Sequence, residues 1–67
     1  MKVGETVKNG SVVIAVKKLS NKEIVLCLWN DITPYVTWNC YDGGITENGH
    51  YHRNLSDAVK EFEERIF

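Results

Sequence analysis

The chain has 67 residues, with eight basic and nine acidic side chains and a formal net charge of −1. This length allows one domain, 1–67, in which folding hides only about 60% of the unfolded chain's surface. The near-neutral charge argues against a strong electrostatic grip on nucleic acid or an anionic membrane. No apolar run approaches the ~18 residues of a membrane span, and two cysteines are too few for a disulfide-built mini-protein. We therefore expect a cytoplasmic protein.

The first half of the chain predicts three strands separated by turns, at 3–8, 11–19 and 23–29. Asn9-Gly10 is a strong hairpin signal, because both residues tolerate the positive φ of a type I′ turn. The third strand alternates two apolar sets, with Ile24, Leu26 and Leu28 on one face and Val25, Cys27 and Trp29 on the other. A loop follows at 30–34, where Pro34 cannot donate to a sheet ladder.

The second half predicts two more strands and one helix. Tyr35–Tyr41 is followed by an Asp42-Gly43-Gly44 turn, and a last strand lies between Ile45 and His52, with Gly49 weakening its middle. The helix is predicted from an apolar stripe with a 3.6-residue period, formed by Leu55, Ala58, Val59, Phe62 and Ile66. Such a short helix must pack on the strands to be stable.

These elements predict an α+β fold: an antiparallel meander of four or five strands, with one C-terminal amphipathic helix packed on one face. We expect Leu55 and Phe62 of the helix to be buried together with Trp38 of the sheet. One helix covers one face only, yet the strands carry apolar residues on both. The residues expected under the helix are Val12, Ile14, Val16, Ile24, Leu26, Leu28, Val36 and Trp38, which leaves Val13, Val25, Cys27, Trp29, Tyr35 and Tyr41.

Two arrangements would cover this second face. In the first, a partner binds there, because leftover aromatic side chains on a sheet are typical of interface cores. In the second, the N-terminal hairpin curls over the sheet towards a small barrel. The candidate protein-binding residues are Val25, Trp29, Tyr35 and Tyr41 on the sheet, with Glu61 and Glu64 on the acidic outer face of the helix. The partner is a host protein or a second copy of the chain.

No residue pattern predicts catalysis. Cys27, Cys40, His50 and His52 fit no zinc-finger spacing, and we interpret them as buried small hydrophobes and edge-strand polar residues. A Cys–His nucleophile pair lacks an activating third group, and the Gly43-Gly44 turn lacks the context of a phosphate-binding loop. We expect no enzyme activity, no metal and no other cofactor.

The runs PYVTWNCYDGG, GHY and NLSDAVKEFEERI carry a resemblance over roughly half of the chain. They resemble small phage and mobile-element proteins of Gram-positive bacteria, which combine a Tyr-Val-Thr-Trp strand, a glycine turn, a Gly-His-Tyr and a Leu-x-x-Ala-x-x-x-Phe-x-x-Arg helix. A looser similarity exists to HicB-type antitoxins, although the chain lacks their separate DNA-binding segment. The first resemblance implies a compact protein that disables or redirects a host component, as anti-CRISPR and other anti-defence proteins do.

Three hypotheses follow. The leading one is a mobile-element inhibitor that occludes a site on a host protein. The second is a partial HicB-like antitoxin, which would be encoded beside a small basic toxin. The third is a small nucleic-acid-binding protein, whose binding would weaken steeply with salt.

Overall fold

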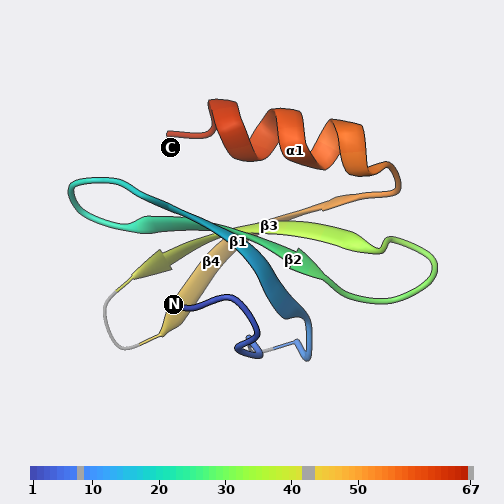
Figure 1. The fold of residues 1–67 in the computed structure, drawn as a ribbon, viewed down its shortest axis with the longest axis horizontal. Helices are drawn as coiled ribbons and strands as arrows, with labels where there is room; N and C mark the ends of the chain where they lie inside the picture. The colour runs from blue at the N-terminus through green and yellow to red at the C-terminus, as the bar shows by residue number, and fades with distance from the viewer. Residues whose placement is uncertain (8, 42–43, 67) are drawn as a thin grey trace.

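The protein folds as a four-stranded antiparallel sheet followed by one helix (Figure 1). The computed structural model describes residues 1–7, 9–41 and 44–66. Strands and helix follow the chain in the order β1 (Val12–Lys18), β2 (Glu23–Leu28), β3 (Tyr35–Tyr41), β4 (Ile45–His52) and α1 (Leu55–Glu64), with the strands in sheet order β1-β2-β3-β4. The predicted meander with a C-terminal helix is therefore confirmed. The first two residues of the predicted Asp42-Gly43-Gly44 turn lie outside the described residues.

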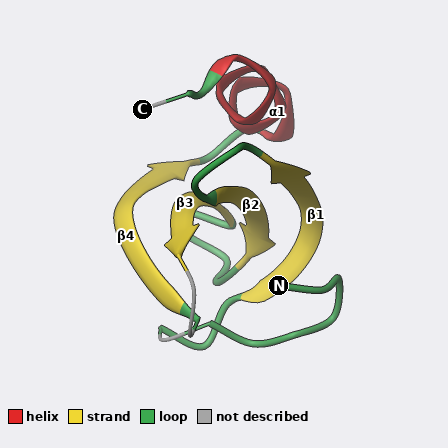
Figure 2. Cartoon of the chain, turned by 90° about the vertical axis from the view of Figure 1, so that its left-hand side faces the viewer, coloured by secondary structure: helices red, strands yellow, loops and turns green. Residues whose placement is uncertain are grey.

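The N-terminal segment covers the sheet face that the helix leaves open (Figure 2). It runs beside the start of β1, where the Gly4 amide donates to the Val13 carbonyl and the Val13 amide donates to the Glu5 carbonyl. Beyond an isolated bridge at Thr6, its described residues form no regular strand. Val7 is 5% exposed and belongs to the core cluster with Val13, Val25, Cys27 and Cys40. The chain's own N-terminus thus covers this core, as the curled arrangement predicts, and no partner is needed for it.

The register between β2 and β3 differs from the expected one. Ile24 lies opposite Asn39, and Val25 lies opposite Trp38. The face that the N-terminal segment covers is called the concave face below. Because paired residues share a face, Trp38 lies with Val25 on this concave face, away from the helix. The expectation that Trp38, Leu55 and Phe62 are buried together is wrong, and Leu55 is 46% exposed. A shift of one residue moves every side chain to the other face, and apolar residues on both faces of β2 leave the choice open.

The side of the helix that meets the sheet is the predicted stripe rotated towards Glu61 and Arg65. Ala58 of the stripe is buried and Val59 and Phe62 are half-buried, whereas Leu55 and Ile66 at its two ends are exposed and Arg65 is buried instead. Glu61, expected on the outer face, bonds to residues of the sheet. The sheet beneath this part of the helix is polar, so a polar helix side is satisfied there by hydrogen bonds rather than by apolar contact.

Candidate functional site

Strand β4 supplies side chains to both faces of the sheet. His50 and His52 lie opposite Thr37 and Tyr35 on the helix-bearing face, and Tyr51 between them lies opposite Val36 on the concave face. This alternation is the ordinary two-residue period of a strand. It divides the Gly-His-Tyr-His run of the sequence between an aromatic cluster and a polar cluster.

The aromatic cluster consists of Trp29, Trp38 and Tyr51. The ring centroids of Trp29 and Tyr51 lie 5.0 Å apart at an angle of 55°, and those of Trp38 and Tyr51 lie 6.0 Å apart at 74°. Trp29 is 39% exposed and Tyr51 is 43% exposed, while Trp38 packs against the concave core. Trp29 and Tyr51 are therefore partly exposed to solvent, and the Tyr51 ring packs on the more buried ring of Trp38.

Asn9 fixes the two exposed rings. Its backbone carbonyl accepts a hydrogen bond from Trp29 Nε1 at 3.0 Å, and its side-chain Nδ2 lies 3.5 Å from the Tyr51 hydroxyl. Its Oδ1 accepts from the amide and the hydroxyl of Ser11, at 3.1 and 2.6 Å. Because Asn9 is tied to the chain in this way, the aromatic pair loses little conformational freedom when it meets a partner.

The sequence-predicted sheet residues do not form one surface. Val25 is fully buried in the core, so it is unavailable for contact with a partner. Tyr35 and Tyr41 lie on the helix-bearing face of β3 and are partly buried. Only Trp29 of the predicted set belongs to the exposed aromatic pair. Sequence reasoning missed Tyr51, although its place between His50 and His52 already put it on the face opposite the two histidines.

The polar cluster lies between the helix and the sheet and is centred on Glu61. His50 Nδ1 lies 2.6 Å from Glu61 Oε2, His52 Nε2 lies 3.1 Å from Oε1, and the Thr37 hydroxyl donates to Oε1. Burial alone raises the pKa of this carboxyl, but the hydrogen bonds from Thr37, His50 and His52 outweigh burial and lower its pKa to about 2. Glu61 is therefore ionised at neutral pH, and its hydrogen bonds attach the helix to the sheet. Glu64, the other predicted contact residue on the helix, is exposed as expected.

Arg65 completes the polar cluster from the end of the helix. Its side chain is fully buried and donates to Asn39 Oδ1 at 3.1 Å, to the Thr37 carbonyl and hydroxyl at 3.1 and 2.8 Å, and to the Asn48 carbonyl. Its guanidinium lies 3.7 Å from the Glu61 carboxylate. Burial lowers the pKa of Arg65, and the Glu61 charge opposes that shift. Arg65 lies seven residues after Ala58 and three after Phe62, so the helical period places it beside the buried part of the predicted stripe, although a stripe defined by apolar residues alone does not include it.

The geometry of the polar cluster is that of a structural ion network. Among the described residues, no three histidine, cysteine, aspartate or glutamate side chains are arranged to hold a metal ion. The fixed positive charge of Arg65 beside Glu61 would also repel a divalent cation. Both histidines contact the same carboxylate, which fits a role in positioning the helix.

The two thiols have the properties of core side chains. Cys27 is fully buried and Cys40 is 3% exposed, both on the concave face, opposite the histidines. Burial raises the pKa of Cys27 to about 11 and also raises that of Cys40. Both thiols are protonated at neutral pH, so neither is an activated nucleophile.

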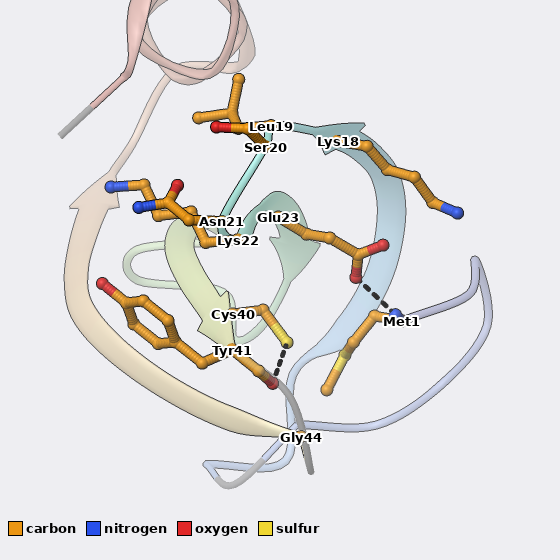
Figure 3. Close-up of a pocket in the computed structure, with 10 residues that line it drawn as sticks. All are labelled: Met1, Lys18, Leu19, Ser20, Asn21, Lys22, Glu23, Cys40, Tyr41 and Gly44. Carbon is orange, nitrogen blue, oxygen red and sulfur yellow. Dashed lines mark hydrogen bonds and ion pairs between the residues drawn. The ribbon is translucent and has the colours of Figure 1, made fainter.

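A hollow of about 410 Å³ opens at the other end of the sheet (Figure 3). The Met1 amine forms an ion pair of 2.5 Å with Glu23 at its side. Lys18 and Lys22 also line it, but Figure 3 shows their amines pointing in different directions, away from its centre. The hollow therefore offers no convergent set of charges to a ligand.

In comparisons with known proteins, no family model, no curated protein and no solved structure matches the chain. Over the described part of the chain, no helix has the length and apolar character needed to cross a membrane.

Proposed function

We propose that this protein is a small non-catalytic protein-binding module whose contact with its partner is centred on Trp29 and Tyr51. The observation that carries this proposal is the pair itself: two large rings in mutual contact, each about 40% exposed and both held by Asn9. Tyr and Trp dominate the energetics of protein interfaces, because each buries a large rigid surface at little entropic cost.

A protein partner fits the surroundings of the pair better than a nucleic acid does. The loop that joins β2 to β3 beside Trp29 carries Asp31 and no lysine or arginine. Single-stranded nucleic acids are bound by rings that alternate with positive charges along a groove. A protein surface needs only apolar contact and a few hydrogen bonds around the rings.

The biological setting that we propose rests on the resemblance to phage and mobile-element proteins. In that setting the module acts in the bacterial cytoplasm and occludes or redirects a host component, as an anti-defence or anti-CRISPR inhibitor does. The protonated thiols and the fully engaged Glu61 support a mode of action by binding alone.

Affinity capture with matched variants tests the proposal. The tagged wild type, Trp29→Ala, Tyr51→Ala and the control Ile45→Ala would be incubated with nuclease-treated extract of the bacterial host. Ile45 is 59% exposed and lies at the opposite end of β4. We expect a host protein that the wild type and Ile45→Ala retain, and that each ring variant binds at least ~30-fold more weakly, a hot-spot loss of about 2 kcal/mol.

Retention of the same host proteins by all four forms would show that the contact lies elsewhere. Retention that disappears with nuclease treatment would favour the nucleic-acid alternative, and recovery of a small basic toxin encoded next door would favour the antitoxin alternative. Circular dichroism of each variant checks that the fold is intact.

A further inference from the structure

The dipeptide Asn-Gly occurs twice in the chain, at Asn9-Gly10 and at Asn48-Gly49, in very different surroundings. An asparagine before glycine is prone to deamidation, because no side chain shields the glycine nitrogen from the asparagine amide. Asn9-Gly10 lies in the turn before β1, where Gly10 is exposed and has a φ of 90°. Asn48-Gly49 lies within β4. The chain therefore carries its own comparison between a turn site and a strand site.

Access to the glycine differs between the two sites. A Cβ atom added at Gly10 would meet no heavy atom within 4 Å, so the space beside this residue is open. A Cβ atom added at Gly49 would stand 2.6 Å from the Trp38 ring. The carbonyl of Asn48 also accepts a hydrogen bond from Arg65. A peptide that is packed and bonded in this way can rotate towards the asparagine side chain only when β4 opens locally.

The side-chain amide of Asn9 is held and polarised by Ser11. Asn9 Oδ1 accepts from the Ser11 amide at 3.1 Å, an Asx turn that folds the side chain back along its own main chain. The same oxygen accepts from the Ser11 hydroxyl at 2.6 Å, and Ser11 is fully buried. A donor on Oδ1 draws electron density from Cγ and stabilises the negative charge that the oxygen gains when Cγ is attacked.

The indole of Trp29 acts on the other reacting group, the Gly10 nitrogen. Trp29 Nε1 donates to the Asn9 carbonyl at 3.0 Å, and this oxygen belongs to the same peptide as the Gly10 nitrogen. A hydrogen bond to the oxygen favours the deprotonated peptide, because the two atoms share its charge. The Gly10 amide donates to the Val7 carbonyl at 2.9 Å, so this bond must open before the nitrogen reacts. Gly10 is exposed in a turn, where local opening costs little.

We propose that Asn9 is a site of intramolecular deamidation, activated by the Ser11 hydroxyl and the Trp29 indole. Hydroxide removes the Gly10 amide proton, and the nitrogen bonds to Asn9 Cγ. The bond from Cγ to Nδ2 then breaks, and the nitrogen leaves as ammonia with a proton from water. Water opens the resulting cyclic imide. Cleavage between the ring nitrogen and Cγ leaves aspartate, and cleavage between that nitrogen and the backbone carbonyl carbon leaves isoaspartate.

Either product changes the support of the exposed rings. Both lack Nδ2, which lies 3.5 Å from the Tyr51 hydroxyl. In isoaspartate the main chain runs through Cβ and Cγ, so the carbonyl that accepts from Trp29 becomes part of a free carboxylate. This consequence rests on the proposed function: a molecule that has been deamidated binds its partner more weakly than a new one.

Incubation of the purified full chain at mildly alkaline pH, followed by peptide mapping with mass spectrometry, tests the proposal. The wild type is compared with Ser11→Ala and Trp29→Phe, and Asn48 is the internal control in each protein. We expect Asn9 of the wild type to react at least ~10-fold faster than Asn48, because β4 must open locally before Asn48 can react. Each variant lacks one activating donor, so it should slow the reaction at Asn9 several-fold and leave Asn48 unchanged.

A wild type in which Asn9 reacts no faster than Asn48 would overturn the proposal, and so would variants in which Asn9 reacts as fast as in the wild type or faster. Trp29→Phe keeps an aromatic ring at a partly exposed position, so it reports on the donor even if Ser11→Ala, at a buried position, lowers stability. The measurement needs no partner. Deamidation without capture of a host protein leaves this inference standing, and capture by a chain whose Asn9 stays intact leaves the proposed function standing.

Discussion

Gly49 lies directly against the indole ring of Trp38. A Cβ atom added at position 49 would stand 2.6 Å from Cζ3 and 2.7 Å from Cη2 of that ring. The φ of Gly49 is not positive, so the requirement for glycine comes from the contact and not from the backbone. The glycine that the sequence suggests as a weak point of the strand is the place where Trp38 packs on the backbone, beneath Tyr51.

We predict that Gly49→Ala lowers the free energy of unfolding by ~1–3 kcal/mol, the usual cost of overpacking a well-packed site. The cost should shrink by ~1 kcal/mol or more in a Trp38→Leu background, because the clashing ring is then absent. Urea denaturation of the four proteins of this double-mutant cycle measures both quantities. An equal cost in both backgrounds would show that the indole is not what excludes a side chain at position 49.

A second prediction concerns Arg65. Arg65→Met removes hydrogen bonds to Asn39, Thr37 and Asn48 and leaves buried acceptors without a donor. We expect a loss of ~3 kcal/mol or more in the free energy of unfolding, because breaking one side of a buried ion network is costly. Arg53→Met is the matched control: Arg53 is exposed and should change stability by under ~0.5 kcal/mol. Equal denaturation midpoints for the two variants would contradict the assignment.

A third prediction concerns pH. Glu61 has a folded-state pKa of about 2, below its ordinary value of 4.5. A lowered folded-state pKa means that the charged carboxylate stabilises the fold above pH 4.5, and that this contribution is lost as the pH falls from 4.5 towards 2. The side chain is 22% exposed, so we expect a contribution of ~2 kcal/mol after allowing for solvent screening.

Glu61→Gln should therefore be less stable than the wild type at pH 7 and should show a flatter loss of stability between pH 4.5 and 2. Glu64→Gln, a change of the same kind at an exposed helix position, should follow the wild-type curve. Thermal melting across this pH range compares the three proteins. Parallel curves for Glu61→Gln and the wild type would mean that the carboxylate is not held by its three hydrogen bonds.

The sequence predicts the four strands and the helix of this fold well, but the strand predicted at 3–8 is wrong over its described residues, where only an isolated bridge at Thr6 forms. The relative rotation of the elements is predicted poorly. The strands at Tyr35–Tyr41 and Ile45–His52 have the predicted bounds, because alternation and turn residues act locally. Which face of β2 meets which face of β3 depends on the register across the 30–34 loop. Apolar side chains on both faces of β2 give no preference between the two choices.

The helix illustrates the same limit. Glu61 and Arg65 face the sheet because Thr37, Asn39 and His50 lie there. Thr37 and His50 form hydrogen bonds with Glu61, and Asn39 accepts one from Arg65. A helical periodicity that counts only apolar residues cannot detect such complementarity. The same one-residue ambiguity placed Tyr35 on the face of Val25, whereas Tyr35 lies opposite Leu28 on the helix-bearing face.

The central claim is that the partner of this protein contacts the Trp29–Tyr51 surface, and site-specific photo-crosslinking in host cells tests it most directly. A benzophenone amino acid would replace Tyr51 in one form, and Lys18, at the opposite end of the sheet, in the other. We predict a crosslink from position 51 to a host protein, or to a second copy of the chain, that Trp29→Ala abolishes, and no such crosslink from position 18. A crosslink to the same protein from position 18 but not from position 51 would contradict the account.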